Sequence, residues 1–296
     1  MKLRQIGEDR LVESLLHRLP ANQLVSAAGD DCAVIKPPAR GNLLVLKTDC
    51  VVEKIHFQSA TDPILVGWKA MMRPLSDFAA TSAIPQFALI TLIVPPTTST
   101  SWVDKLYRGL RRAALRFDVH IVGGETSATR GPVAISVSVS GFVEKKRWVS
   151  RAGGKRGDDL FVTGYLGGSL RGRHLRFVPR IEESRWLTRN FRIHAMMDLS
   201  DGLGADLPRL AKASKVGFKI DKEKLPVAPG TKVDNAISDG EDYELLFAIS
   251  PRDRKRLERA WRKKFPGLSL TRIGHLAQPL NNLTSQLLPR GYVHFQ

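Results

Sequence analysis

The chain has 296 residues, enough for one large or two medium domains, and its 43% hydrophobic content can build an ordinary globular core. Its only two cysteines, Cys32 and Cys50, form no CxxC pair, which excludes a disulfide framework and favours a reducing cytoplasm. No apolar run reaches the roughly 18 residues that span a bilayer, so we expect no membrane segment.

Basic residues outnumber acidic ones and give a formal net charge of +17. They gather in two helix-like segments, 108–116 and 252–264, in which apolar residues recur at helical spacing. Solvated helix faces are the favoured interpretation, and nucleic-acid binding is the alternative. Since no zinc-finger, RRM or KH signature accompanies the charge, nucleic acid is not an expected partner. A basic field that attracts anionic substrates such as nucleotides is an intermediate possibility.

Helices and strands are predicted to alternate along the first half of the chain. An amphipathic helix near the N-terminus precedes a loop with an acidic pair, and Pro74 is expected to kink or restart the second helix. The further elements, in chain order, are a buried strand at 43–47, a helix over 63–83, a strand at 87–94, a basic helix over 102–117, a short strand at 119–122 and an alternating strand at 133–140.

A domain boundary is predicted near residue 148, because segment 145–158 is basic, contains glycines and lacks apolar periodicity. The two predicted domains are residues 1–148 and 149–296. Neither a P-loop nor a GxGxxG spacing is present, so a nucleotide would be bound by other means. The later elements are strands at 160–163, 195–197, 218–220 and 244–249, and helices at 181–189, 203–213 and 251–264.

Short acidic clusters recur at the ends of these elements, beside Gly, Ser or Thr. Many carboxylates that converge on one point repel each other unless cations lie between them. Oxygen ligands suit Mg²⁺, and protein-bound Mg²⁺ usually holds phosphates as well. The pattern therefore indicates phosphoryl transfer. The clusters lie at residues 29–31, 48–49, 76–77, 123–126, 198–202 and 240–242.

Each acidic residue also has an ordinary structural interpretation. Asp77, on an apolar helix, could cap the helix or pair with Arg73, but metal binding is favoured because several other acidic turns could share the ion. Asp49 could initiate a turn, and Ser200 and Asp201 could cap the helix that follows them. Three acids within nine residues at a strand–helix junction, counting Asp206, are harder to explain as caps alone.

Two further groups could contact phosphates. Glycines at 123 and 124 would let backbone amides approach a phosphate closely, with Glu125 holding the bridging metal. Arg151 could clamp a phosphate as a fork donor, although alone it is more typical of a surface arginine.

Taken together, the motifs resemble the thiamine-monophosphate kinase family, in the superfamily of aminoimidazole ribonucleotide synthetase, selenophosphate synthetase and a hydrogenase maturation enzyme. The similarity covers almost the whole chain, and the motifs occur in the family's order. The resemblance rests on GDDCAVI, TDCVVEKIHF, LSDFAATSAIP, IVGGETS, SRAGGKRGD, VPR, MDLSDGLGADL, SDGEDYELLF and GYVHF.

This resemblance implies a two-domain α+β fold. An N-terminal α+β domain would form a β-barrel with its copy in a homodimer, and a C-terminal α/β sandwich domain would complete the nucleotide and substrate site. The implied reaction is direct in-line transfer of the γ-phosphoryl of ATP to thiamine phosphate, assisted by several Mg²⁺ ions, to give thiamine diphosphate.

Site residues follow from the matching motifs. The implied metal ligands are Asp31, Thr48, Asp49, Asp77, Glu125, Asp198 and Asp201. The implied ATP-binding residues are Phe117, Gly124, Arg151 and Ser200. Thiamine phosphate would be bound by His56, Glu241 and Tyr292. No covalent nucleophile or general base is implied, since the attacking phosphate oxygen is already anionic.

Three positions depart from the family pattern. Lys47 replaces a usual Ser and places a cation beside the acids, Pro74 replaces a common Asn, and Glu125 is one methylene longer than the usual Asp. These changes, together with GGET, motivate a second hypothesis: another ATP-dependent phosphorylating or synthetase activity of the superfamily. The net charge motivates a third, a non-catalytic nucleic-acid-binding protein.

Overall fold

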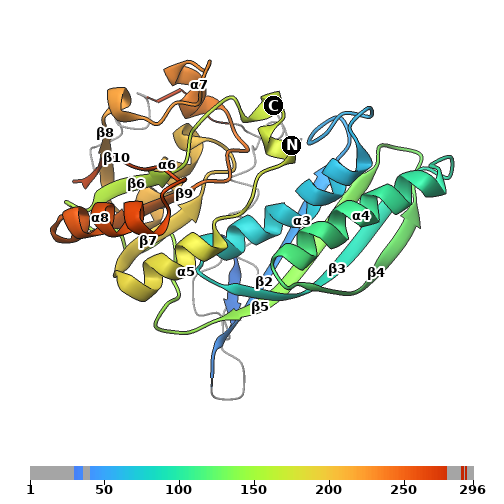
Figure 1. Ribbon diagram of the computed structural model, residues 1–296, viewed down its shortest axis with the longest axis horizontal. Helices are drawn as coiled ribbons and strands as arrows, with labels where there is room; N and C mark the ends of the chain where they lie inside the picture. Colours follow the sequence, from blue (N-terminus) through green and yellow to red (C-terminus); the bar gives the residue numbers. More distant parts are fainter. Residues whose placement is uncertain (1–29, 36–40, 279–287, 290, 292–296) are drawn as a thin grey trace, which may run out of the picture.

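The computed structural model describes residues 30–35, 41–278, 288, 289 and 291, and its elements form two halves, each built on a five-stranded sheet (Figure 1). The predicted N-terminal helix lies outside the described residues. The predicted boundary near residue 148 falls between the last strand of one sheet, which ends at Val143, and the first strand of the other, which begins at Asp159. None of the described helices combines the length and apolarity needed to cross a bilayer.

The N-terminal sheet has the strand order β1-β2-β5-β3-β4, in which only β3 and β4 are parallel neighbours. Its inward side chains pack under two helices that lie on the same face (Figure 1). The elements are β1 (Ala33–Ile35), β2 (Leu43–Val52), α3 (Pro63–Ala80), β3 (Ile84–Val94), α4 (Thr100–Arg116), β4 (His120–Ala128) and β5 (Ala134–Val143).

Helix α3 is the central element of the molecule. Asp62 caps its first turn by accepting a hydrogen bond from the Ile64 amide. The helix then continues through Pro74, where the sequence predicted either a kink or a restart, and it does not restart there. It contacts β2, β5 and α4 in its own half and α5 and β7 in the other half. Packing on several sides compensates for the hydrogen bond that a proline removes.

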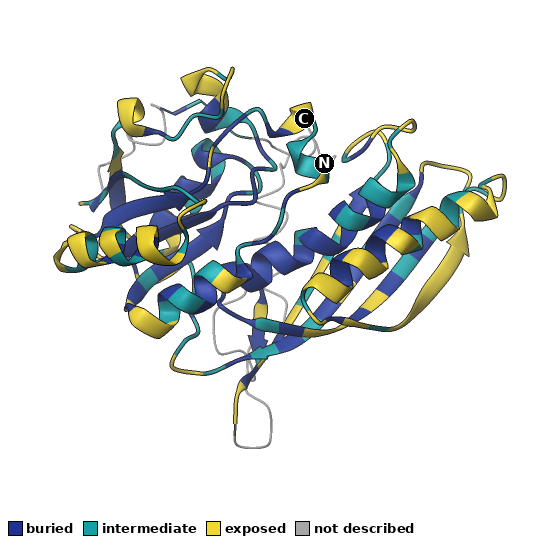
Figure 2. Cartoon of the chain, in the orientation of Figure 1, coloured by how far each residue is buried: buried dark blue, intermediate teal, exposed yellow. Residues whose placement is uncertain are grey.

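None of the described helices covers the opposite face of the N-terminal sheet, which we call the uncovered face (Figure 2). Alternation along the strands places the exposed apolar side chains of three strands on this uncovered face. They are Leu44, Leu46, Phe87, Leu89 and Val122. A cluster of exposed apolar side chains of this kind is typical of a surface that contacts another molecule.

The C-terminal sheet has the strand order β7-β9-β6-β10-β8 and is antiparallel throughout. Both of its faces are covered. Phe161 and Phe247 belong to the core under α5 and α8, whereas Leu160 and Val162 belong to the core under α6. The elements are β6 (Asp159–Thr163), α5 (Ile181–Asn190), β7 (Ile193–Asp198), α6 (Leu203–Ala213), β8 (Gly217–Ile220), α7 (Val233–Ser238), β9 (Leu245–Ile249), α8 (Arg254–Lys264) and β10 (Leu270–Ala277).

Four short 3-10 turns complete this half: η1 (Ser169–Arg171), η2 (Arg173–Leu175), η3 (Lys222–Lys224) and η4 (Pro251–Asp253). The two-domain α+β organisation is confirmed, with layered helices and sheet in the C-terminal half. Two strands extend further than predicted. β2 continues to Val52 instead of ending at Lys47, so Asp49 lies within the strand and does not initiate a turn. β4 continues to Ala128 instead of ending at Val122, because pairing with β3 carries it through both glycines.

Candidate active site

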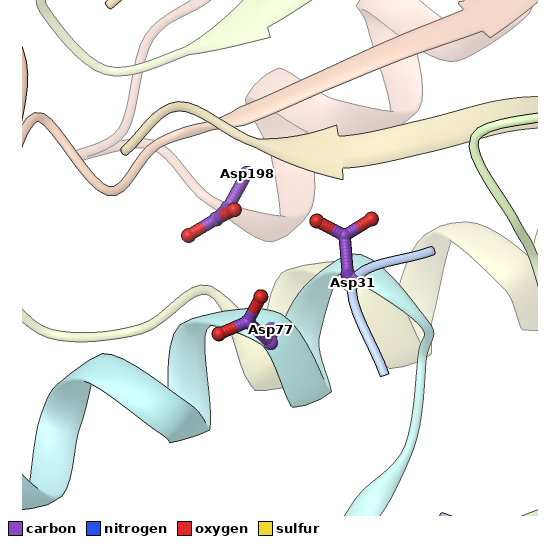
Figure 3. Close-up of side chains that lie close together, drawn as sticks. All are labelled: Asp31, Asp77 and Asp198. Carbon is purple, nitrogen blue, oxygen red and sulfur yellow. The ribbon is translucent and has the colours of Figure 1, made fainter. Parts of the chain in front are cut away.

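Three carboxylates from distant parts of the chain meet between the two halves. Asp31 comes from the segment before β1, Asp77 from the last turns of α3 and Asp198 from the end of β7. One oxygen from each lies within 4.8 Å of the others, and all three side chains are buried. Figure 3 shows the three carboxylates turned toward a common space. We call Asp31, Asp77 and Asp198 the acid cluster.

Each member of the acid cluster has one donor partner from another element. Asp31 accepts two hydrogen bonds from the Arg151 guanidinium, at 3.0 and 2.8 Å. Ser76 Oγ donates to Asp198 Oδ2 at 2.6 Å. Asp77 Oδ1 lies 3.0 Å from the Lys47 ammonium. These contacts bring the GDDC, LSD, DLSD and SRAGG motifs together in space.

Burial and mutual repulsion make the acid cluster unfavourable as a set of anions. Burial, followed by the charge of Asp31, raises the pKa of Asp198 to about 7. Burial raises the pKa of Asp77 well above its ordinary value, and the carboxylates around it raise it further against the opposing effect of Lys47. Neighbouring Asp30 has its pKa raised to about 6, mainly by burial and then by Asp31. A divalent cation between the carboxylates would reverse these effects.

Asp49 lies at the edge of the acid cluster. Its carboxylate is 3.7 Å from the Lys47 ammonium and 3.9 Å from the Arg73 guanidinium. Its Oδ2 atom is buried and accepts no hydrogen bond from any residue that the structure describes. A buried carboxylate oxygen without a donor is costly, and coordination to a metal would satisfy it. The oxygen-only donor set therefore fits Mg²⁺.

Thr48 is not brought to the acid cluster, although it precedes Asp49. Successive side chains of a strand point to opposite faces, so the two residues face opposite ways. The Thr48 hydroxyl instead hydrogen-bonds Ser136 and Ser138 on the uncovered face of the sheet, at 3.3 and 3.0 Å. The predicted role of this hydroxyl as a metal ligand therefore has no support in the structure.

Two other predicted metal ligands also lie outside the acid cluster. Asp201 pairs with Arg209 of α6, and Asp206 accepts from both Arg209 and the Asp201 amide, so these acids organise the start of α6. Glu125 is exposed in the middle of β4, where Ser127 donates to it at 3.3 Å. The cluster among the described residues is thus smaller than the predicted ligand set.

Of the four predicted ATP-binding residues, only Arg151 contacts the acid cluster in the described part of the chain. A Cβ on Gly124 would lie 1.9 Å from the Ile90 carbonyl oxygen, so close strand packing requires this glycine without any phosphate. Phe117 follows α4 and packs on the hydrophobic core. The Ser200 carbonyl accepts from the Glu241 amide at 2.7 Å, which links the DLSD segment to the GEDYEL segment.

A second charged group lies beside α3 and was not predicted as a unit. The Lys69 ammonium, fully buried, is 2.8 Å from His174 Nδ1 of η2 and 2.6 Å from Glu241 Oε1. It also donates to the His56 carbonyl at 2.6 Å. We call Lys69, His174 and Glu241 the lysine triad. The triad thus includes Glu241 and contacts His56, two of the three residues predicted to bind thiamine phosphate. The third, Tyr292, lies outside the described residues.

Lys69 and Glu241 of the lysine triad are held in their ionised forms. Burial alone would raise the pKa of Glu241, but the hydrogen bond with His174 and the Lys69 charge lower it to about 2. Burial lowers the pKa of Lys69 to about 8 against the attraction of Glu241, which leaves the ammonium protonated at neutral pH. A lysine within an apolar helix was the one feature of the sequence that could have indicated a functional role for Lys69. His174 carries no such signal.

The segment around Glu241 has a strained backbone. Glu241 and Tyr243 have φ angles of 63° and 53°, in the left-handed region that non-glycine residues rarely adopt. Tyr243 stacks on Phe177, with ring centroids 3.8 Å apart, and its hydroxyl donates to Glu241 at 3.3 Å. His56 is fixed as well, because its Nδ1 accepts from the Val52 amide at 3.0 Å, which leaves the proton of a neutral ring on Nε2. Local strain held by surrounding contacts is typical of functional sites.

Comparison with known proteins shows the family of the chain. Residues 29–143 match the family described as AIR synthase related protein, N-terminal domain, and residues 137–275 match its C-terminal domain. A thiamine-monophosphate kinase of Rhodopirellula baltica is 35% identical over 92% of both chains, and one of Aquifex aeolicus is 32% identical over the full length of both.

The chain belongs to the thiamine-monophosphate kinase family. A solved structure described as AaThiL complexed with AMPPCP and TMP matches 99% of both chains, at 31% identity and a TM-score of 0.85. The thiamine-monophosphate kinase of Stenotrophomonas maltophilia matches 92% of this chain, with a TM-score of 0.74. The hydrogenase maturation protein HypE of E. coli, at 20% identity, shares the fold.

Proposed function

We propose that this protein transfers the γ-phosphoryl group of ATP to thiamine phosphate. A phosphate oxygen of thiamine phosphate would form a bond to the γ-phosphorus while the bond from that phosphorus to the β,γ-bridging oxygen breaks, which gives thiamine diphosphate and ADP. The observation that carries this proposal is the full-length similarity to a kinase structure that holds AMPPCP and TMP. The buried acid cluster supports it independently.

The acid cluster and Asp49 would hold Mg²⁺. When bound, the metal would neutralise charge on the phosphates and help to align them for in-line transfer. The residues themselves have positioning roles. Ser76 orients Asp198, and Arg151 orients Asp31 by a two-point contact. Because the acceptor oxygen is already anionic, no side chain needs to remove a proton.

The lysine triad would position the acceptor. Lys69 is buried and cannot itself meet the substrate, but it holds the His56 carbonyl and the Glu241 carboxylate at fixed positions. With the carboxylate of Glu241 ionised and the Nε2 of His56 protonated, the pair offers an acceptor and a donor. The acceptor suits the cationic thiazolium ring of thiamine phosphate, and the donor suits its phosphate. Tyr292 stays a predicted member of this site.

We also propose a homodimer that forms through the uncovered face of the N-terminal sheet, as the family resemblance implies. The apolar residues Leu44, Leu46, Phe87, Leu89 and Val122 support this proposal, since they would leave water on association. Static light scattering of the full chain should give the mass of a dimer. The variant Leu89→Lys should shift it to the monomer.

Turnover is tested with purified protein, ATP, Mg²⁺ and thiamine phosphate, by following both ADP and thiamine diphosphate by chromatography. We expect equal amounts of the two products and no ADP when either Mg²⁺ or thiamine phosphate is omitted. ADP that appears only with a different phosphate or small-molecule acceptor would favour another activity of the superfamily. Folded protein with no turnover on any acceptor would end the proposal.

A further inference from the structure

Lys47 has an unusual place for a lysine in a site built to attract cations. It lies in β2, two residues before Asp49, so alternation puts both side chains on the strand face that meets α3. Its ammonium is 3.0 Å from Asp77 Oδ1 and 3.7 Å from Asp49 Oδ2. It therefore bridges the two carboxylates that β2 and α3 contribute.

Side-chain cations already compensate most of the negative charge at this site. The four carboxylates are Asp31, Asp49, Asp77 and Asp198, and the cations beside them are Lys47, Arg73 and Arg151. Asp30, which lies beside Asp31 and accepts a hydrogen bond from the Arg151 amide, is a fifth carboxylate, so two negative charges are left. A site of this kind cannot accept several divalent ions without gaining a large positive charge, even before the anionic substrates bind.

The compensation is uneven across the acid cluster. Asp31 is paired with Arg151, and Asp77 with Lys47. Among the described residues, Asp198 accepts a hydrogen bond from the neutral Ser76 alone and forms no salt bridge, although the charges of Lys47 and Arg151 act on it from a longer distance. A divalent ion would therefore gain the most favourable electrostatic energy on the side of the cluster next to Asp198. The side next to Asp49 and Asp77 already holds an ammonium.

We propose that Lys47 is a built-in cation of this site: its ammonium takes the place of one divalent ion between Asp49 and Asp77. This inference rests on the proposed kinase function only for the identity of the metal, Mg²⁺. The protein would then need one divalent ion fewer than a site with a neutral residue at this position. Its metal-free form would also stay folded, because the ammonium compensates two buried carboxylates that would otherwise repel each other.

The test is a count of bound divalent ions in the full-length protein, without nucleotide or acceptor. Mn²⁺ serves as the probe, and its free concentration is read from its electron paramagnetic resonance signal. The variant Lys47→Ser should bind one more Mn²⁺ per chain than the wild type. Lys47→Arg, which keeps a cation, should bind the same number as the wild type, and so should the control Lys219→Ser at an exposed strand position.

Thermal unfolding provides a second readout. In EDTA, Lys47→Ser should unfold at a temperature lower by about 5 °C or more, because two buried carboxylates lose their partner. Saturating Mg²⁺ should recover most of this loss, whereas it should change the wild type much less.

Equal Mn²⁺ counts in the wild type and Lys47→Ser would overturn the inference. A variant that stays unfolded in saturating Mg²⁺ would overturn it as well, since a divalent ion could not then replace the ammonium. Both readouts are independent of turnover, so loss of the proposed kinase function would appear separately in the product assay.

Discussion

The acid cluster and the lysine triad lie at different points along α3, around Asp77 and Lys69, and they stabilise buried charge in opposite ways. The acid cluster gathers charges of one sign, and burial raises the pKa of Asp77 and of Asp198. The lysine triad pairs opposite charges, and the pKa of Glu241 falls to about 2. One group depends on added cations, whereas the other is complete within the protein.

This difference separates two tasks in the proposed reaction. A site that must bind and release metal–nucleotide has to keep oxygen ligands that the protein itself does not neutralise, and Asp198, whose described partner is the neutral Ser76 hydroxyl, is such a ligand. A group that positions the acceptor needs a fixed geometry before binding, which a satisfied network of hydrogen bonds provides. Lys47 makes the acid cluster resemble the lysine triad in one respect, because it places a positive charge beside Asp77.

The largest expected effect comes from Asp77→Asn. Removing one carboxylate from the metal site should lower kcat at least about 100-fold, since metal assistance contributes several kcal/mol to such transfers. Metal-free stability should change little, because relief of repulsion offsets the lost pair with Lys47. The matched control is Thr48→Val, which faces away from the acid cluster and should retain kcat within about twofold. Product chromatography measures both, and a fully active Asp77→Asn would remove Asp77 from the site.

Lys69→Met tests the other side of the comparison. It leaves Glu241 buried without its cation and should cost about 3 kcal/mol in the free energy of unfolding. The KM for thiamine phosphate should rise more than the KM for ATP, because His56 and Glu241 lose their anchor. The exposed helix position Lys105→Met is the control. Urea unfolding and steady-state kinetics are the measurements, and an ATP-only change in KM would contradict the assigned role.

The smallest expected effect is a pH dependence of the metal-free protein. Asp198 and Asp242 have pKa values raised to about 7, both mainly by burial, so the folded state holds protons that the unfolded state releases above about pH 4. Stability should therefore fall as pH rises from about 4 to 7, by roughly 3 °C in melting temperature between pH 5.5 and 7.5.

Mg²⁺ should reduce this dependence, because it keeps Asp198 ionised, while the contribution of Asp242, paired with Arg173, should remain. Differential scanning calorimetry in EDTA and in Mg²⁺ measures the two slopes. An identical pH dependence with and without Mg²⁺ would indicate that Asp198 does not bind the metal.

Much of the fold was readable from periodicity. The strict alternation of 133–140 and the apolar run of 87–94 became β5 and β3, and the helices over 203–213 and 251–264 appeared close to their predicted bounds. Errors arose where partners distant in sequence decide the outcome. The pair Gly123-Gly124 resembles a turn locally, but its pairing with β3 keeps it extended. The strand β10 was not predicted, and it is completed by its pairing with β6 and β8.

The candidate site shows the same division. Asp31, Asp77 and Asp198 were predicted as ligands and do converge, whereas Asp201 pairs with Arg209 instead. The orientation of the Thr48 side chain away from Asp49 could have been predicted, since residues adjacent in a strand face opposite ways. His174 could not have been found, because nothing in its local sequence indicates that Lys69 lies 2.8 Å away.

By itself, the sequence determined the family, the set of available acids and the alternation of helices and strands, because motifs and periodicity are properties of neighbouring residues. Only the tertiary structure decided which acids share a site, which cation partners them and which faces remain uncovered. The hydrogen bond between Ser76 and Asp198 joins residues 122 positions apart. Such contacts depend on how the two sheets pack around α3, which no local segment specifies.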